Sequence, residues 1–289
     1  NTDEYVEVYN EAALQDNAGK PGFLQRPLIT DAIRENLPNV NHLKAIFQEG
    51  IIQNHSLSIS GTSGKTRYFI SGNYFGQEGI IKSSDYRRLS GRLNLVTEVK
   101  PWLRTGVGLN LSNAITDIIG SSGDGAGGNG GSVIRYAFFR TPAIPIYTAS
   151  GAFTDKPSDN HNDDNLYTNL FGDGYNPVGM LAYNNNRLHS NRLFGKYFIE
   201  VQPVPGLKFT TNAAVDYTDS NQRRFDRNWG TLNRINNPNN LSVIDRNAVT
   251  TTLSSFLNYS RTDGPHSYTF LLGTEAVKAR RYDFFAGEQ

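Results

Sequence analysis

Long segments in which apolar and polar side chains alternate constrain the fold of this chain more than any other feature. In the run 103–112, for example, Leu103, Val107 and Leu109 alternate with polar or glycine neighbours, and the pattern recurs between residues 54 and 280. Successive side chains of a strand point to opposite faces, so each run predicts a strand with one apolar face. We count eight such strands of about 9–15 residues, where soluble sandwiches favour about 5–6 and a tilted membrane-crossing strand needs about 9–11.

The connections between these strands alternate in length without exception. Short and long connections follow each other in the order 61–65 (short), 76–86 (long), 97–101 (short), 113–190 (long), 203–206 (short), 219–247 (long) and 262–265 (short). Outer-membrane barrels join their strands by short periplasmic turns and long extracellular loops. The sequence therefore predicts an all-β fold, part of a large antiparallel transmembrane β-barrel.

The first fifty residues differ from the rest of the chain. Segments 5–14 and 30–37 have helical character, and glycine and proline residues separate them. If the short turns are periplasmic, the first strand runs away from the cell surface. We therefore expect residues 1–50 to form an extracellular helical loop and residues 51–289 a barrel segment whose two ends are both extracellular.

Composition narrows the class further. The net charge of +1 predicts no nucleic-acid partner, and the chain has no cysteine for disulfides, thiolate metal sites or cysteine catalysis. A mean hydropathy of −0.49 without an apolar run near 18 residues excludes a helical membrane protein but not a barrel. Because the sequence lacks an initiator Met and a signal peptide, we expect a mature or internal piece.

No motif of enzyme chemistry emerges. The stretch 61–66 ends in a Gly-Lys-Thr run, but Ile59 stands where a phosphate-binding loop requires its first glycine, which favours a hairpin turn. The five histidines have no metal-ligand spacing, and no nucleophile elbow is present. The sequence predicts no catalytic residue and no bound cofactor.

One loop is rich in oxygen ligands. Its aspartates are Asp155, Asp159, Asp163, Asp164 and Asp173. Such a loop can hold Ca²⁺, but the EF-hand spacing fails, so a calcium site and a solvated polar loop both stay open. The glycine-rich segment 120–131 likewise fits either a surface loop or a mobile segment near a solute path.

Two groups of residues are candidates for contact with a solute. Aromatic side chains in the long loops could stack on sugars or peptide side chains, or pack the loops themselves: Tyr167, Phe171, Tyr175, Tyr183 and Trp229. Charged side chains on the non-apolar faces of the strands are expected to line the polar lumen of a barrel: Arg88, Arg92, Arg104, Lys196, Glu200 and Lys208.

Several sequence blocks resemble the SusC/RagA family of TonB-dependent outer-membrane transporters. These blocks are 53–61, 65–72, 74–80, 85–95, 172–177, 191–195, 224–226 and 272–276. The resemblance spans most of the chain and is specific in combination. It implies a 22-stranded barrel with an N-terminal plug, of which this chain would supply about strands two to nine.

The resemblance also implies a function. The whole protein would import a large nutrient, an oligosaccharide or oligopeptide, across the bacterial outer membrane. Its partners would be a SusD-like surface lipoprotein acting as a lid, the TonB complex through a plug outside this chain, and the lipid around the barrel. The alternative from a different class is a soluble secreted β-rich module that binds carbohydrate or serves a structural role.

Overall fold

The computed structural model describes residues 1–119, 133–154, 170–172, 175–226 and 240–288. Its main element is one sheet of eight antiparallel strands in sequence order. The strands are β1 (Ile52–Ser63), β2 (Thr66–Gln77), β3 (Tyr86–Lys100), β4 (Leu103–Asp117), β5 (Asn184–Val204), β6 (Leu207–Asp226), β7 (Asn240–Asp263) and β8 (His266–Glu288). The predicted all-β class and the number of strands are therefore confirmed.

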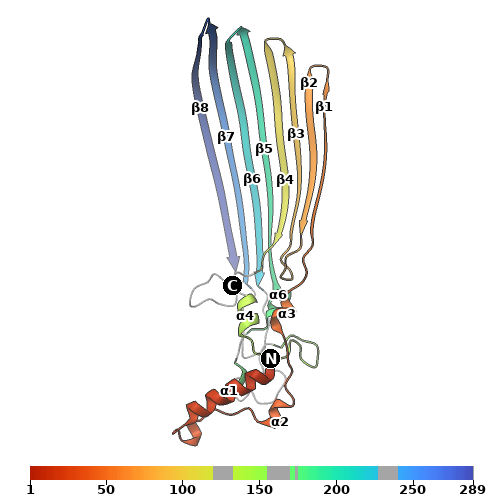
Figure 1. Cartoon of the computed structure of the whole chain (residues 1–289), viewed down its shortest axis with the longest axis vertical. Coiled ribbons are helices and arrows are strands. Elements are labelled where there is room, and N and C mark those ends of the chain that lie inside the picture. The colour runs from red at the N-terminus through yellow and green to blue at the C-terminus, as the bar shows by residue number, and fades with distance from the viewer. Residues whose placement is uncertain (120–132, 155–169, 173–174, 227–239, 289) are drawn as a thin grey trace.

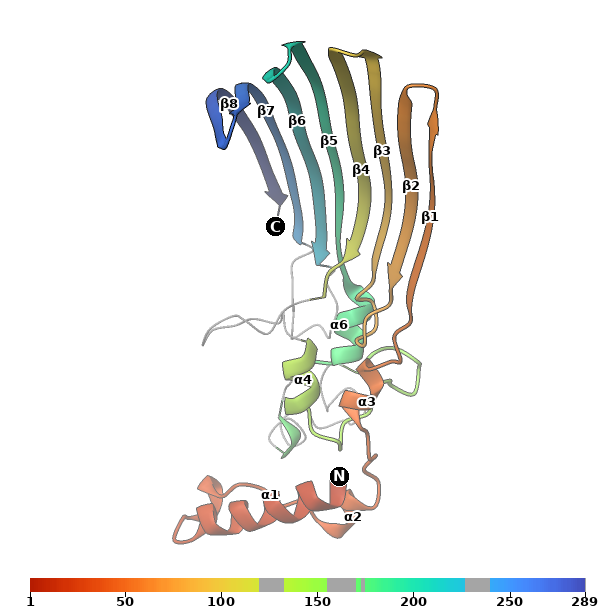
Figure 2. The same cartoon turned by 45° about the horizontal axis from the view of Figure 1, so that its top comes forward.

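The sheet is a meander of four hairpins that curves across its width (Figure 1, Figure 2). Each hairpin closes through two residues, and the four turns lie at one end of the sheet. Gly64, Gly206 and Gly264 have positive φ angles of 58°, 85° and 57° in these turns, a conformation that glycine adopts without strain. The long connections and the helices lie at the opposite end, which we call the loop end.

The register gathers the alternating apolar residues of the eight strands on one side of the sheet. Ile59, Ile70, Leu93 and Leu109 are direct partners across β1 to β4, and the row continues to Val215 in β6. Direct partners in antiparallel strands point the same way. The odd-numbered residues of β3 to β7 and their partners in β1, β2 and β8 thus form one surface, the apolar face, and the other residues form the polar face.

No second layer covers the apolar face within the part of the chain that the structure describes. Leu57, Phe270 and Leu272 are 81%, 64% and 72% exposed, and many other large hydrophobic side chains of this face are open as well. Soluble proteins rarely expose a continuous apolar surface of this extent. The described helices include none that is long and apolar enough to cross a membrane.

Strands β4 to β7 are longer than the sequence predicts and reach into the segments 113–190 and 219–247, which were expected to be loops. In the structure β4 ends at Asp117, β5 begins at Asn184, β6 ends at Asp226 and β7 begins at Asn240. In these extensions apolar residues are fewer and scattered, such as Ile115, Phe225 and Leu241, so the regular alternation visible in the sequence is lost. Cross-strand side chains hold the extensions instead. Arg187 Nε donates to Asp117 Oδ1 at 2.6 Å, and Asn113 Nδ2 donates to Asn191 Oδ1 at 2.6 Å.

The loop end carries a helical assembly built from two distant parts of the chain. Its helices are α1 (Thr2–Asn17), η1 (Gly22–Leu24), α2 (Asp31–Arg34), α3 (His42–Ile46), α4 (Val133–Phe139) and α6 (Pro177–Tyr183). Two buried clusters join the N-terminal segment to the β4–β5 connection. One contains Val6, Ile144 and Leu170, and the other contains Ile46 and Val133. Residues 1–46 therefore do not form an independent unit.

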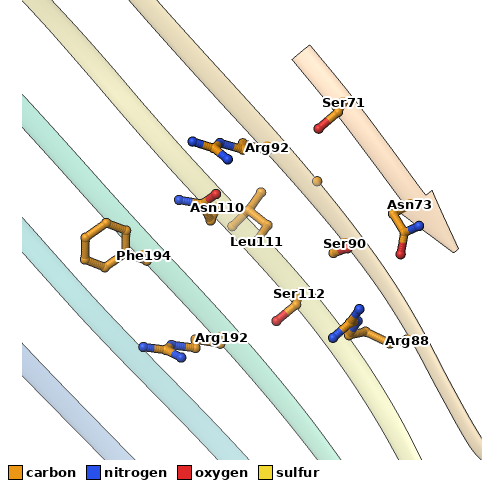
Figure 3. A pocket seen from close by; sticks show the side chains of 11 residues that line it. Ser71, Asn73, Arg88, Ser90, Arg92, Asn110, Leu111, Ser112, Arg192 and Phe194 are labelled. Carbon is orange, nitrogen blue, oxygen red and sulfur yellow. The ribbon is translucent and has the colours of Figure 1, made fainter. Parts of the chain in front are cut away.

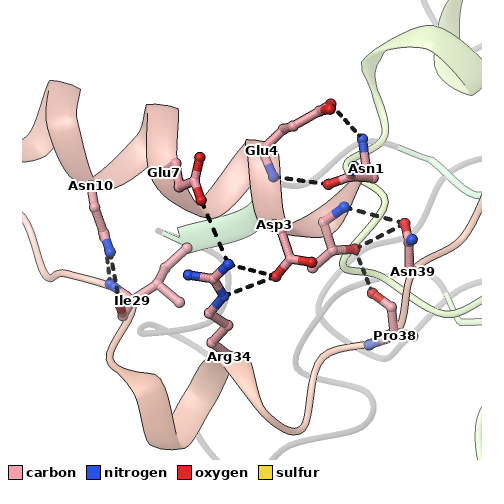
Figure 4. A network of polar contacts seen from close by, with 10 residues as sticks. Asn1, Asp3, Glu4, Glu7, Asn10, Ile29, Arg34, Pro38 and Asn39 are labelled. Carbon is pink, nitrogen blue, oxygen red and sulfur yellow. Dashed lines mark hydrogen bonds and ion pairs between the residues drawn. The ribbon is translucent and has the colours of Figure 1, made fainter.

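Polar contacts fix α1 against the segment that follows it (Figure 4). Arg34 Nη2 lies 2.7 Å from Asp3 Oδ1, and the Asn10 side chain donates to and accepts from the backbone of Ile29, both at 2.8 Å. Thr2 Oγ1 donates to the carbonyl of Pro38 at 2.6 Å. Backbone groups that no regular element pairs are satisfied in this way.

His42 is expected to make this assembly sensitive to acid. The side chain is 3% exposed, and its Nε2 lies 3.1 Å from the Thr141 carbonyl. Burial, and then the charge of Arg140, lower the pKa of His42 from 6.5 to about 4. Between pH 6.5 and 4 His42 binds a proton in the unfolded segment but not in the folded one. The contribution of His42 to the folding free energy is therefore fully present above pH 6.5, and up to about 3 kcal/mol is lost as the pH falls toward 4.

Hydrogen exchange of the amides in α3, measured in the intact protein and corrected for intrinsic rates, checks this expectation. Protection should fall as the pH is lowered from 7.5 to 4.5. His42→Gln keeps an N–H donor for the Thr141 carbonyl but does not titrate, so its protection should not vary with pH. Equal pH dependence in both proteins would contradict the assignment.

Candidate functional site

The polar face of the sheet collects the charged residues that the sequence singled out. Arg88, Arg92, Arg104, Lys196, Glu200 and Lys208 are all even-numbered residues of β3 to β6, and the register puts them on this one face. The face also holds apolar side chains, such as Phe194, Phe256 and Val277. The predicted residues thus share a surface. Five of them separate into two groups along the strands, and Lys196 lies between Arg192 and Glu200 on β5, outside both groups.

The first group lies near the two-residue turns, and its positive charge is partly compensated. Glu200 Oε1 lies 3.8 Å from Arg104 Nη1 and 3.6 Å from Lys208 Nζ, so one carboxylate serves two cations. The Arg104 guanidinium also lies 5.5 Å from the ring centre of Phe198. Exposed ion pairs of this length contribute about 0–1 kcal/mol each.

The second group forms a pocket of about 540 Å³ toward the loop end, with small residues at its base. Ser112 is the direct partner of Ser90 in β3 and of Arg192 in β5. Figure 3 shows Ser112 between Arg88 and Arg192, with Arg92 beyond Asn110. The floor of hydroxyl groups leaves room between the three guanidinium groups.

The arginines of the pocket differ in their partners. Arg192 donates two hydrogen bonds to Asp216, from Nε to Oδ1 at 3.0 Å and from Nη2 to Oδ2 at 2.6 Å. This bidentate geometry fixes the guanidinium plane. The sequence pattern placed Arg192 and Asp216 on the same side as Arg88 without marking them as a site. Their even numbering was the available signal, but it does not show which charges meet.

Comparison with known proteins identifies the class of this sheet. The sequence is 24% identical to TonB-dependent receptor P3 of Formosa agariphila over 279 residues, which cover 96% of this chain and 26% of the relative. TonB-dependent receptor SusC of Bacteroides thetaiotaomicron is 20% identical over 86% of this chain and 25% of its own. The RagAB peptide importer in its open-open state superposes with a TM-score of 0.71 at 19% identity, over 99% of this chain and 32% of that chain. The chain is thus similar in sequence to TonB-dependent receptors that include SusC, and similar in fold to RagAB.

The chain spans about a quarter of the length of these curated relatives, and no family model matches it. The relatives have the names of receptors, and the solved structure is of an importer, so none of these names is that of an enzyme. The resemblance found in the sequence blocks is therefore confirmed over nearly the whole chain.

The aromatic candidates of this chain pack within the helical assembly where the structure describes them. Phe171 is 3% exposed and its ring centre lies 6.1 Å from that of Tyr5, so this ring takes the second role that the sequence left open, packing in the core of the loop. Tyr175 and Tyr183 are half-buried against Tyr136 and Phe153, with ring centres 4.9 and 5.5 Å apart, and their contact with a solute stays a prediction.

Several predictions fall outside the described residues. Tyr167 and Trp229 belong to this group, as do the glycine-rich segment 120–131 and the aspartate loop with its proposed calcium site. Among the residues that are described, no group of three or more His, Cys, Asp or Glu side chains could hold a metal ion.

Proposed function

We propose that this chain is part of the wall of an outer-membrane barrel that imports a large nutrient in a TonB-dependent manner. The observation that carries the proposal is the apolar face, which is continuous over all eight strands and uncovered in the described chain. Lipid is the environment that accepts such a surface. The polar face then lines the lumen, and residues 51–289 form the barrel segment.

The dimensions of the apolar face support this placement. In β5 the apolar residues run from Leu193 to Val201, and Asn191, His189 and Arg187 follow on the same face. The run is about 27 Å long at about 3.4 Å per residue, or about 21 Å high at a tilt of about 40°. Outer-membrane barrels have an apolar band about 25 Å tall. The strands continue beyond this band at the loop end.

The loop end supports an extracellular position for the helical assembly. The two-residue turns at the other end match periplasmic turns, so residues 1–50 and the β4–β5 connection would face the medium. A SusD-like lipoprotein acting as a lid is the partner proposed for this side, and the TonB complex is the partner proposed for a plug outside this chain. The RagAB structure is that of a peptide importer, and this supports an oligopeptide as well as the oligosaccharide that we keep as the second solute class.

Uptake by cells that lack the intact protein tests the proposal. The deletion strain is grown on a mixture of oligosaccharides and on a mixture of peptides, and the remaining solutes are identified by mass spectrometry. We expect one class to stay in the medium and to be consumed again when the gene is restored. Consumption of both classes at the wild-type rate would contradict import by this protein.

Solubility separates this function from that of a secreted β module. The intact protein should require detergent for extraction and should bring a lipoprotein with it. A protein that stays monodisperse in buffer without detergent would contradict the proposed barrel and support the soluble alternative.

A further inference from the structure

Two arginines without a carboxylate partner distinguish the loop-end pocket from the charged group near the two-residue turns. Among the described residues, Asp216 is the one carboxylate bound to an arginine of this pocket, and it pairs with Arg192. Arg88 and Arg92 are exposed, and no described carboxylate lies within 4 Å of either guanidinium group. Near the two-residue turns, by contrast, Glu200 lies within 4 Å of both Arg104 and Lys208, so each of these cations has a carboxylate neighbour.

Aromatic rings hold these two arginines in place. The Arg88 guanidinium lies 5.8 Å from the ring centre of Phe75, and that of Arg92 lies 5.8 Å from the ring centre of Phe69. With the Asn94 amide turned to satisfy both its groups, its oxygen accepts from Arg92 Nε at 3.0 Å. Contacts to ring faces leave the terminal N–H groups of a guanidinium free to donate. The pocket therefore presents oriented donors that lack an acceptor.

From this geometry we infer that the pocket binds an anionic oxygen group of the imported solute, a carboxylate or a sulfate. A guanidinium fork matches such groups with two parallel hydrogen bonds. The pocket of about 540 Å³ can hold one anionic residue of a chain-like solute, and Ser90 and Ser112 offer further hydrogen bonds at its base. The inference rests on the proposed import function, since it names the chemistry of the solute.

The position of the pocket favours a solute over a part of the receptor itself. Arg88 lies two residues after the start of β3 at the loop end, whereas the partly compensated group lies near the turns. Under the proposed orientation the loop end is where a solute enters. The arginines without a carboxylate partner thus lie on the entry side, whereas Arg104 and Lys208 on the periplasmic side share Glu200.

The test compares matched acidic and neutral probes on the intact protein in detergent. Binding of hexaglutamate against hexaglutamine, and of hexagalacturonate against maltohexaose, is measured by calorimetry at 50 and 300 mM salt. In one of the two pairs the acidic probe should bind at least tenfold more tightly at low salt, and high salt should weaken this preference. The pair that responds tells whether the anionic group belongs to a peptide or to a glycan.

Two variants test whether the preference for acidic probes depends on the arginines of the pocket. The double substitution Arg88→Gln and Arg92→Gln should abolish the acidic preference while the neutral probe binds as before. Arg67→Gln removes a cation of the same face near the turns, where it pairs with Glu98 at 3.5 Å, and should leave the preference intact. Equal binding of acidic and neutral probes, no binding of any probe, or a preference that survives the double substitution would overturn the inference. The proposed function is judged separately by the uptake of nutrient mixtures, which requires no charge preference.

Discussion

Leu253→Arg is expected to destabilise the barrel by about 2–4 kcal/mol, the cost of an arginine near the middle of a bilayer. Leu253 lies on the apolar face, is 53% exposed, and has Ala213 and Ala276 as direct partners. Under the proposed function its side chain contacts lipid tails, which cannot solvate a guanidinium group. The intact protein should therefore lose its folded, heat-modifiable band on gels at a lower temperature than the wild type.

The neighbouring position supplies the matched control. Thr252 lies on the polar face between Ala214 and Val277, so Thr252→Arg adds the same side chain without a charged direct partner. Its effect on the transition temperature should be small, because the new guanidinium reaches a polar lumen. Equal losses in the two variants, or a larger loss for Thr252→Arg, would reverse the assignment of the faces.

Asn176→Leu is expected to cost the helical assembly about 3–5 kcal/mol. Asn176 is fully buried; its Nδ2 donates to the carbonyls of Ile146 and Thr154 at 2.8 and 2.9 Å, and its Oδ1 accepts from the amides of Val178 and Gly179 at 3.1 and 3.2 Å. Leucine has a similar volume but makes none of these four hydrogen bonds. The two carbonyls keep a second donor, Thr154 N–H at 2.9 Å for Ile146 and Arg140 Nη2 at 2.8 Å for Thr154, so it is the two amides that lose their partner. Each buried amide left without a partner costs about 1–3 kcal/mol, and each hydrogen bond lost at a carbonyl about 0.5–1.5 kcal/mol.

Hydrogen exchange in α6 and in residues 141–154 of the intact protein measures this loss, which corresponds to a fall in protection of about a hundredfold or more. Asn36→Leu is the control within the same assembly, because Asn36 is exposed and donates one hydrogen bond, to Ala32 at 2.9 Å. It should change protection by less than about 1 kcal/mol. Unchanged exchange in Asn176→Leu would show that the four hydrogen bonds do not hold the assembly.

The sheet was predictable because its signals are local. Period-two alternation locates each strand, and the turn residues, such as the glycine of the turn 64–65, define each hairpin. Hairpin order then sets the register, and the register decides that Arg88, Glu200 and Lys208 share one face. These residues could be placed together from the sequence because β3 to β6 all present their even-numbered residues on the same face.

Two features escaped prediction because they depend on contacts between distant residues. The strand extensions near Asn191 and Asp117 lack a continuous apolar face, so hydrophobic alternation ends before the strands do. Phe171 was a candidate for solute contact because it is aromatic and lies in a long loop. Phe171 is buried against Tyr5 because α1 packs onto that loop. The two residues are far apart in the sequence, so no local pattern predicts this contact.

The central claim is that the odd-numbered residues of β4 face lipid and the even-numbered residues face the lumen. Nitroxide labels placed one at a time from Thr105 to Leu111 in the intact protein, reconstituted in lipid vesicles, test it directly through collisions with oxygen and with a water-soluble nickel complex. Oxygen should dominate at positions 105, 107, 109 and 111, and the nickel complex at positions 106, 108 and 110. An alternation of opposite phase, or access of the nickel complex to both sets, would contradict the claim.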